Sequence, residues 1–167
     1  MAATKRIAVT GGYGFIGSAL IRLLLTGTDY EVLNIDKLTY AANPASIPAA
    51  SKNPRYHSVG AGILNAPAMR KVFDEFQPCT VMHLAAENYV DRSIDGPQEF
   101  ITTNIAGTFT LLQEALRHWG GLPREDAGQF RFLHVSPHGG QSRRALISFV
   151  RRDQGRNRAQ LVRARVL

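Results

Sequence analysis

A short apolar run that leads directly into a glycine-rich turn and then into a helical pattern is the feature that most restricts the fold. Arg6–Thr10 is apolar and β-branched, the turn reads G-G-Y-G, and Phe15–Leu25 places apolar residues at helical spacing. Strands are also predicted at Glu31–Asp36, Tyr56–Val59, Thr80–Ala85 and Phe130–Val135, and helices at Ala66–Phe76 and Phe100–Trp119. This alternation predicts an α/β fold, a Rossmann-like doubly wound parallel sheet of about five strands with its site at the carboxyl edge.

The charge of the chain divides it into two parts. The chain has a net charge of +7, yet residues 1–136 hold 12 basic and 12 acidic residues, so residues 137–167 carry the whole excess with eight Arg, no Lys and one acid, Asp153. We therefore expect a partial nucleotide-binding domain over 1–136 and an irregular basic tail over 137–167. The tail is interpreted as an out-of-frame or disordered extension, with a genuine but divergent tail as the alternative. Its segments 145–150 and 159–167 could each form a short helix or strand.

The composition excludes several classes of protein. The tail has only one aromatic residue, Phe149, so a single-stranded nucleic acid would lack stacking platforms and nucleic-acid binding is not expected. The apolar run around Leu23–Leu25 is broken by Arg22 and is too short to span a bilayer. A single cysteine, Cys79, excludes a disulfide framework and is expected to be a small reduced hydrophobe. The expected location is the cytoplasm.

The turn after the first strand carries the clearest chemical signal. Its sequence, T-G-G-Y-G-F-I-G, places glycines at positions 11, 14 and 17, which can supply a tight turn, close approach of a diphosphate and close packing of helix on strand. The helix that follows would direct its free N–H groups toward the anion. Asp36 ends the next predicted strand 19 residues after Gly17 and can accept hydrogen bonds from ribose hydroxyls while repelling a 2′-phosphate. The set predicts NAD rather than NADP.

Five segments together resemble the amino-terminal half of a dTDP-glucose 4,6-dehydratase, an extended short-chain dehydrogenase/reductase. They are the glycine turn, D-K-L-T-Y-A from Asp36, H-L-A-A-E from His83, V-D-R-S-I from Val90, and T-N-I-A-G-T from Thr103. The resemblance covers residues 5 to 136 and ends there.

The resemblance implies a cofactor site built from the glycine turn, the adenosine-side segment, the end of the fourth strand and the long helix. The matching positions are Gly11, Gly14, Phe15, Ile16, Gly17, Asp36, Lys37, Leu38, Thr39, Ile63, Leu84, Ala85, Ala86, Glu87 and Thr103. The implied partner is a dTDP-glucose-type nucleotide sugar, and the family forms homodimers.

Two positions within the matched part depart from the family. The family has Asp-Ile after the third strand to hold the adenine, and this chain has Gly62-Ile63, which removes one acceptor and weakens adenine binding by about 1 kcal/mol. The family has Ser-His after L-A-A-E, and this chain has Asn88-Tyr89, so Asn88 is the candidate sugar contact. His83 and His134 lie in apolar strands and are expected to be satisfied core histidines.

The residues that perform the family's chemistry are missing from this sequence. The reaction needs a Tyr whose pKa is lowered by a Lys four residues later, and a Thr-Asp-Glu run after the fifth strand. No Tyr follows Tyr89, no Lys follows Lys71, and Ser136 is followed by P-H-G-G-Q. We expect an NAD-binding, catalytically inactive portion of a dehydratase without its substrate-binding domain. The alternatives are a related nucleotide-sugar epimerase or decarboxylase, and a non-catalytic nucleotide-binding or basic-tail module. An exposed fifth strand would favour self-association.

Overall fold

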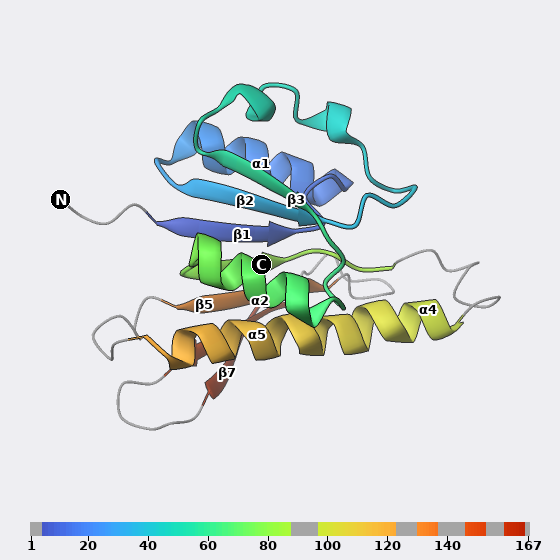
Figure 1. Cartoon of the computed structure of the whole chain (residues 1–167), viewed down its shortest axis with the longest axis vertical. Helices are drawn as coiled ribbons and strands as arrows, with labels where there is room; N and C mark the ends of the chain where they lie inside the picture. The colour runs from blue at the N-terminus through green and yellow to red at the C-terminus, as the bar shows by residue number, and fades with distance from the viewer. Residues whose placement is uncertain (1–4, 88–96, 123–129, 137–145, 153–158, 166–167) are drawn as a thin grey trace.

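The computed structural model of the protein contains one mixed sheet with helices on both faces (Figure 1). It describes residues 5–87, 97–122, 130–136, 146–152 and 159–165. The strands are β1 (Arg6–Thr10), β2 (Glu31–Asp36), β3 (Tyr56–Gly60), β4 (Thr80–His83), β5 (Arg131–Ser136), β6 (Leu146–Arg152) and β7 (Ala159–Arg165). The helical elements are α1 (Phe15–Gly27), η1 (Pro44–Ser46), η2 (Ala50–Lys52), α2 (Ala66–Phe76), α4 (Pro97–Ile101), η3 (Thr102–Gly107) and α5 (Thr108–Gly120).

The first five strands confirm the predicted parallel arrangement. The sheet order is β3-β2-β1-β4-β5-β6-β7, and every pairing among β1 to β5 is parallel. The chain moves outward from β1 to β3 and then returns to the other side of β1 at β4. The carboxyl ends of β1 and β4 therefore lie side by side at the point where the strand order reverses, which is where open α/β sheets bind ligands.

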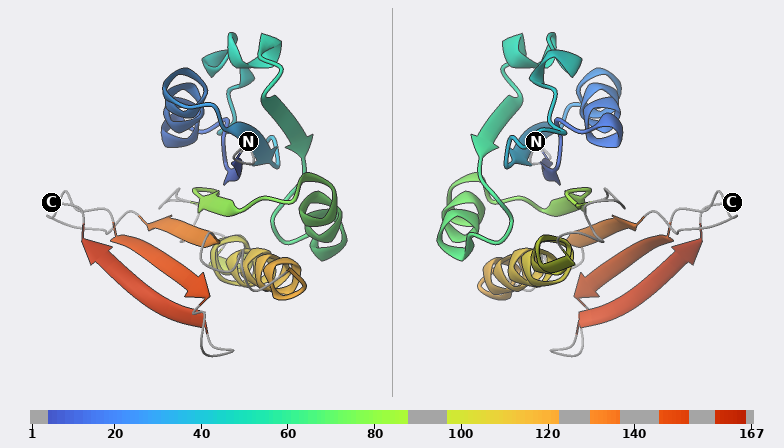
Figure 2. Two further views of the ribbon diagram at one scale, coloured as in Figure 1. Left: turned by 90° about the vertical axis from the view of Figure 1, so that its left-hand side faces the viewer. Right: turned by 90° about the vertical axis from the view of Figure 1, so that its right-hand side faces the viewer.

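The central strands β1 and β2 bury both of their faces, as parallel strands between two helical layers do. In β1 the side chains of Ile7 and Val9 pack with α1, while Ala8 between them packs with α2 and α5. Figure 2 shows α1 on one face of the sheet and the pair α2 and α5 on the other. This two-residue period explains why the strand reads as continuously apolar in sequence.

Two segments of the expected irregular tail are strands in the structure. β6 pairs antiparallel with β5, and β7 pairs antiparallel with β6, so the sheet has seven strands and β5 is not its edge. Of the two alternatives for these segments, helix or strand, the structure shows the strand, so the described part of the tail is not irregular, and β6 covers the edge that β5 would otherwise expose. The sequence L-I-S-F-V of β6 is rich in β-branched and aromatic residues, which favours a strand over a helix.

The predicted long helix is interrupted by a π-helical stretch. α4 and α5 are continuous through η3, whose six residues, Thr102–Gly107, widen the helix. Gly107 ends η3 and faces Ile63 in the loop between β3 and α2, where a Cβ on Gly107 would lie 2.8 Å from Cγ1 of Ile63. Because π-helical turns occur most often at functional positions, this interruption is a candidate feature of the site.

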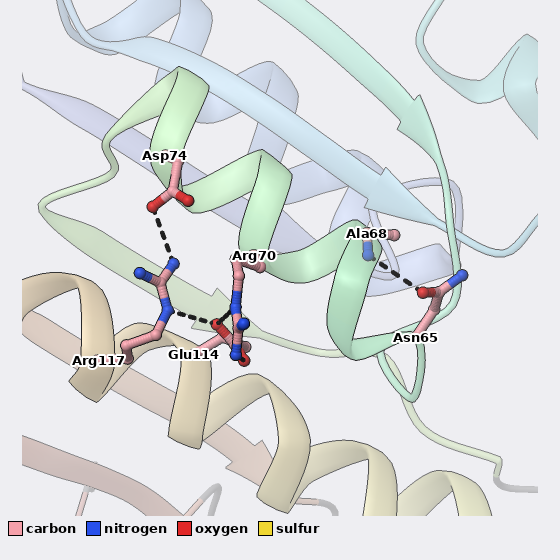
Figure 3. Close-up of polar contacts among 6 residues, drawn as sticks. All are labelled: Asn65, Ala68, Arg70, Asp74, Glu114 and Arg117. Carbon is pink, nitrogen blue, oxygen red and sulfur yellow. Dashed lines mark hydrogen bonds and ion pairs between the residues drawn. The ribbon is translucent and has the colours of Figure 1, made fainter.

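A polar cluster joins α2 to α5 at the surface (Figure 3). Arg70 donates to Oε1 of Glu114 at 2.9 Å, and Arg117 donates to Oε2 of Glu114 at 2.7 Å and to Asp74 at 2.8 Å. Glu114 is only 6% exposed, and the hydrogen bond from Arg70 is the main reason that its pKa is lowered. Asn65 caps the start of α2, where its Oδ1 accepts from Ala68 N at 3.1 Å.

We expect Glu114→Gln to lower the free energy of unfolding by about 1 kcal/mol, because both guanidinium partners are partly exposed and compete with water. The effect should fade as the pH falls through the lowered pKa of Glu114, since protonation removes the same charge. Glu75→Gln is the control, because among the described residues Glu75 pairs only with exposed Lys71, at 3.8 Å. Urea unfolding of both variants measures the difference, and equal losses would contradict the role of Glu114.

The described residues contain neither a membrane-spanning helix nor a metal-binding cluster. Among these residues no helix combines the length and apolar character needed to cross a membrane. The same residues contain no group of three or more His, Cys, Asp or Glu placed to hold a metal ion.

Candidate dinucleotide-binding site

The glycine turn lies at the carboxyl end of β1, and its local geometry requires glycine at positions 11 and 17. Gly11 has φ of +71°, a conformation that favours glycine, and a Cβ there would lie 2.8 Å from the amide nitrogen of Ala85. At Gly17 a Cβ would collide with the carbonyl oxygen of Gly11, so this glycine lets α1 pack against the turn. At Gly14 a Cβ would lie 3.2 Å from the same oxygen. Gly11 and Gly17 therefore shape the turn, whereas Gly14 lies at the start of the helix.

The first turn of α1 presents unoccupied hydrogen-bond donors. Gly14 is the N-cap residue, and no side chain of the described residues caps the helix or places an acid in its first turn. The N–H groups of a first helical turn have no acceptor within the helix, and they combine with the positive end of the helix dipole. Phe15 and Ile16 at this end are 95% and 59% exposed, so the approach to these amides is open. This geometry suits a phosphate or diphosphate.

Asp36 lies at the end of β2 and is aligned by the turn itself. Its Oδ2 accepts from Tyr13 N at 3.0 Å, and its Oδ1 accepts from Leu38 N at 2.9 Å. A carboxylate has about four acceptor positions, so each oxygen retains one for a further donor such as a ribose hydroxyl. Leu38 has φ of +58°, which is rare for a branched side chain and indicates local strain beside this carboxylate.

A buried polar network below the turn was not predicted. Asn34 is fully buried in β2, and its Oδ1 accepts from Gly12 N at 3.0 Å while its Nδ2 donates to the hydroxyl of Tyr56 at 3.1 Å. The hydroxyl of Tyr56 in turn donates to that of Tyr13 at 3.3 Å. Burial is the main cause of the raised pKa of Tyr56, which keeps this phenol neutral. A single Asn inside the apolar run E-V-L-N-I-D was the sequence signal for this network.

The end of β4 closes against the turn through Thr10. The hydroxyl oxygen of Thr10 accepts from the amides of Leu84 and Ala85, each at 3.2 Å. Because Gly11 has no Cβ, the backbone of Ala85 can approach the turn this closely. Ala85 is partly buried and Ala86 is exposed, so small side chains line the edge between β1 and β4.

The segments that follow β2 and β4 meet across this edge. The hydroxyl of Tyr40 donates to Oε1 of Glu87 at 2.7 Å. Asn104 in η3 holds the backbone of Glu87 from both sides, because its Oδ1 accepts from Glu87 N and its Nδ2 donates to Glu87 O, each at 2.8 Å. Tyr40 and Asn104 stand within the segments D-K-L-T-Y-A and T-N-I-A-G-T, but their partners were not predictable from spacing.

The remaining predicted positions surround the same edge or lie outside the described residues. Lys37 and Thr39 are exposed beside Asp36, and Thr103 is partly buried in η3. Ile63 is 5% exposed and its side chain packs in the core against Gly107, so only its backbone remains available to a ligand. Asn88, the candidate sugar contact, lies outside the described residues, as does Tyr89.

The two strand histidines behave differently. His83 is fully buried, with Nδ1 2.7 Å from the Thr10 hydroxyl and Nε2 2.9 Å from the Thr108 hydroxyl, so the prediction of a satisfied core histidine is confirmed for it. Burial is the main cause of its pKa of about 3. For His134 the prediction is wrong, because its buried Nδ1 has no hydrogen-bond partner in the part of the chain that the structure describes. The two rings lie 4.9 Å apart.

The arrangement fits a dinucleotide on three independent features. The Gly11 turn and the open start of α1 suit a diphosphate, and Asp36 has acceptor positions left for a ribose. The small residues at the end of β4 leave room for a flat ring beside the backbone. The adenine position is the weak point, because Gly62 offers no side chain, although a Cβ there would make only an ordinary contact of 3.5 Å with the Lys37 side chain.

Comparisons with known proteins agree with this geometry. The chain is 50% identical over 131 residues to dTDP-glucose 4,6-dehydratase 1 of Escherichia coli (strain K12), covering 78% of this chain and 36% of the relative. The structure of the Streptomyces venezuelae dTDP-glucose 4,6-dehydratase DesIV with NAD bound aligns with a TM-score of 0.64 and 41% identity, over 68% of this chain and 36% of that one. The UDP-glucose 4-epimerase of Thermotoga maritima aligns with a TM-score of 0.61 and 30% identity, over 68% and 34%.

A family model described as GDP-mannose 4,6 dehydratase matches residues 8–138, which is most of the chain. The chain spans only about a third of the length of the curated relatives that it matches. The match includes the glycine turn, Asp36, the end of β4 and η3. On this evidence the chain belongs to the GDP-mannose 4,6 dehydratase family.

Proposed function

We propose that this chain is the NAD-binding part of a dTDP-glucose 4,6-dehydratase. The observation that carries the proposal is the close approach of the Gly11 turn to Ala85 beside the uncapped start of α1 and the carboxylate of Asp36. The relative from Escherichia coli bears the dehydratase name, and the aligned Streptomyces venezuelae dehydratase was solved with NAD. The expected location is the cytoplasm.

Each group of residues has one task in this proposal. The turn and the start of α1 hold the diphosphate, and Asp36, Lys37, Leu38 and Thr39 border the adenosine. The end of β4 and Thr103 border the nicotinamide. Bound NAD would supply a hydride acceptor, and the residues of this chain orient it and exclude water from its buried side. Asn88 is proposed as a sugar contact.

The same proposal assigns no catalytic residue to this chain. Its sequence has neither a Tyr-x-x-x-Lys pair nor a Thr-Asp-Glu run after β5, which the resemblance requires for proton transfer and elimination. We therefore propose that residues 1–136 form the partial NAD domain, that the substrate domain is not contained in this sequence, and that the tail is not part of the site.

Binding and turnover are measured separately on the same protein. We expect NAD to bind and raise the melting temperature, NADP to bind at least tenfold more weakly because Asp36 repels a 2′-phosphate, and dTDP-glucose to give no 4-keto product. Equal binding of NAD and NADP would contradict the role of Asp36. Product formation by the pure chain would contradict the proposed inactivity.

A nucleotide-sugar epimerase is the second candidate. The aligned Thermotoga maritima structure supports it, since a UDP-glucose 4-epimerase has the same fold at 30% identity. The cofactor site serves both reactions alike. The segments D-K-L-T-Y-A and V-D-R-S-I and the higher identity to dehydratases favour the first candidate.

Restoring an acid at position 62 tests the adenine end of the proposed site. We expect Gly62→Asp to strengthen NAD binding about fivefold, because one recovered hydrogen bond to the adenine amino group contributes about 1 kcal/mol. The change is sterically permitted, since a Cβ at Gly62 makes only an ordinary contact. Gly62→Asn is the matched control for charge, and unchanged affinity in both variants would show that adenine is bound elsewhere.

We further propose that the chain forms a homodimer through the outer side of the long helix. Ile101, Ile105, Phe109 and Leu116 are between 37% and 64% exposed and recur at helical spacing along α4, η3 and α5. An apolar row of this length is typical of a helix that packs against another surface.

Sedimentation analysis tests this interface. Phe109→Glu should shift the dimer to monomer, whereas Leu23→Glu should not, because Leu23 is 65% exposed on a different helix, α1. A wild-type monomer at tens of micromolar would contradict the proposal.

A further inference from the structure

Three side chains form a hydrogen-bonded series that runs from β1 through β4 to α5, next to the candidate site. It joins Thr10 at the end of β1, His83 at the end of β4 and Thr108 at the first residue of α5. The Nδ1 atom of His83 lies 2.7 Å from the Thr10 hydroxyl, and its Nε2 lies 2.9 Å from the Thr108 hydroxyl. The proposed contacts to the cofactor do not use His83 or Thr108.

The direction of each hydrogen bond follows from the partners of Thr10. Its hydroxyl oxygen already accepts from the amides of Leu84 and Ala85, so its own hydrogen is left for Nδ1 of His83. Nδ1 is therefore the acceptor, and Nε2 carries the hydrogen and donates to Thr108. The hydrogen-bonded series has a single arrangement of hydrogens as long as the imidazole is neutral.

Thr108 fixes one end of the π-helical segment η3. Asn104, near the middle of η3, is bound to the backbone of Glu87, and Gly107, at its end, packs against Ile63. The bond from His83 is the third attachment, and it links the end of the segment to β4, which leads directly into Leu84 and Ala85. Thr103 lies within the segment that these three attachments hold.

We infer that His83 is a positioning residue that, through Thr108, holds η3 and Thr103 at the correct distance from the end of β4. The inference rests on the proposed NAD binding, because that distance defines the nicotinamide half of the proposed site. The π-helical segment has a different hydrogen-bond register from the α-helices on either side of it, so an attachment at its end fixes where the segment lies. The imidazole itself touches no ligand in this account.

The bonding pattern distinguishes this role from simple core packing. An apolar side chain of similar size at position 83 would fill the same space against Phe132, whose ring centroid is 5.9 Å from that of His83. Such a side chain would remove the hydrogen bonds that the hydroxyls of Thr10 and Thr108 make with His83. The effect of losing Thr108's hydroxyl should therefore depend on whether His83 is present.

The test compares NAD with ADP, which has the adenosine and diphosphate but no nicotinamide. We expect Thr108→Val to weaken NAD binding five- to tenfold and ADP binding less than twofold, and Thr108→Ser to restore NAD binding. Thr110→Val is the control, since the hydroxyl of Thr110 bonds only to Ala106 O at 2.9 Å among the contacts described. In a His83→Phe background, Thr108→Val should have no further effect.

Each outcome has one meaning. If the wild-type chain binds neither NAD nor ADP, the proposed function fails and the inference fails with it. If the wild type binds NAD but Thr108→Val matches Thr110→Val, the positioning role is wrong while the proposed function stands. An equal loss of NAD and ADP binding, or additive effects of the two substitutions, would also overturn the inference, because either points to a general effect on the fold.

Discussion

Replacing Gly14 with valine is expected to weaken NAD binding about a hundredfold. Gly14 caps α1, where a Cβ would lie 3.2 Å from the Gly11 carbonyl oxygen and a branched side chain would occupy the approach to the free amides. Loss of one hydrogen bond between an amide and a charged phosphate costs about 1.5–3 kcal/mol, which corresponds to one to two powers of ten in affinity. Its φ of −73° is available to any residue, so the backbone itself is not strained by the change.

The matched control for this variant lies in the same helix. Gly27 ends α1, and a Cβ there would meet nothing within 4 Å, so Gly27→Ala should leave NAD binding unchanged and raise stability slightly. Circular dichroism establishes that both variants are folded, and fluorescence titration with NADH gives the affinities. A folded Gly14→Val protein that binds within threefold of wild type would place the diphosphate elsewhere.

Lowering the pH from 7 to 4 is expected to decrease the free energy of unfolding of the wild-type chain by about 3 kcal/mol more than that of a His83→Phe variant. Burial, with a smaller effect from His134, lowers the pKa of His83 from 6.5 to about 3. In the unfolded chain His83 is therefore protonated below pH 6.5, whereas in the folded chain it stays neutral until about pH 3. The free energy of unfolding falls as the pH is lowered through that range. At about 1.36 kcal/mol for each pH unit below 6.5, the loss at pH 4 is about 3 kcal/mol.

The groups around His83 do not account for the difference in pH-dependent stability between the wild type and His83→Phe. The facing groups are the hydroxyls of Thr10 and Thr108, the ring of Phe132 and the imidazole of His134, whose pKa is also lowered by burial. The effects of His134, His118 and Glu114 act in both proteins and cancel to first order. Urea unfolding at each pH measures the difference, and ¹⁵N NMR reports the tautomer of His83 directly. A titration midpoint near 6.5 would contradict the buried neutral imidazole.

The sequence alone predicts the position of a site residue whose role depends on its local backbone. Gly11 and Gly17 must be glycine because of local geometry, and Asp36 ends a strand whose neighbour is fixed by the βαβ connection, so their positions followed from spacing. The helix α2 has the predicted bounds, because Asn65 and Pro67 mark its start and its apolar period is clear.

The sequence alone does not predict a side-chain contact that depends on how two distant elements are placed against each other. The pairing of His83 with Thr108 spans 25 residues and depends on a π-helical widening that helical periodicity does not reveal. The bond between Tyr40 and Glu87 spans 47 residues and depends on how two loops meet. The sequence does not distinguish helix from strand for the segments that form β6 and β7, because a short apolar run has no distinguishing period.

Isothermal titration of the folded chain with NAD measures whether the Gly11 turn and the start of α1 hold a dinucleotide. We expect saturable binding at one site per chain, weakened strongly in Gly14→Val and unaffected in Gly27→Ala. Absence of heat with both NAD and NADH at several temperatures, on protein shown to be folded, would contradict the assignment of the glycine turn to a dinucleotide.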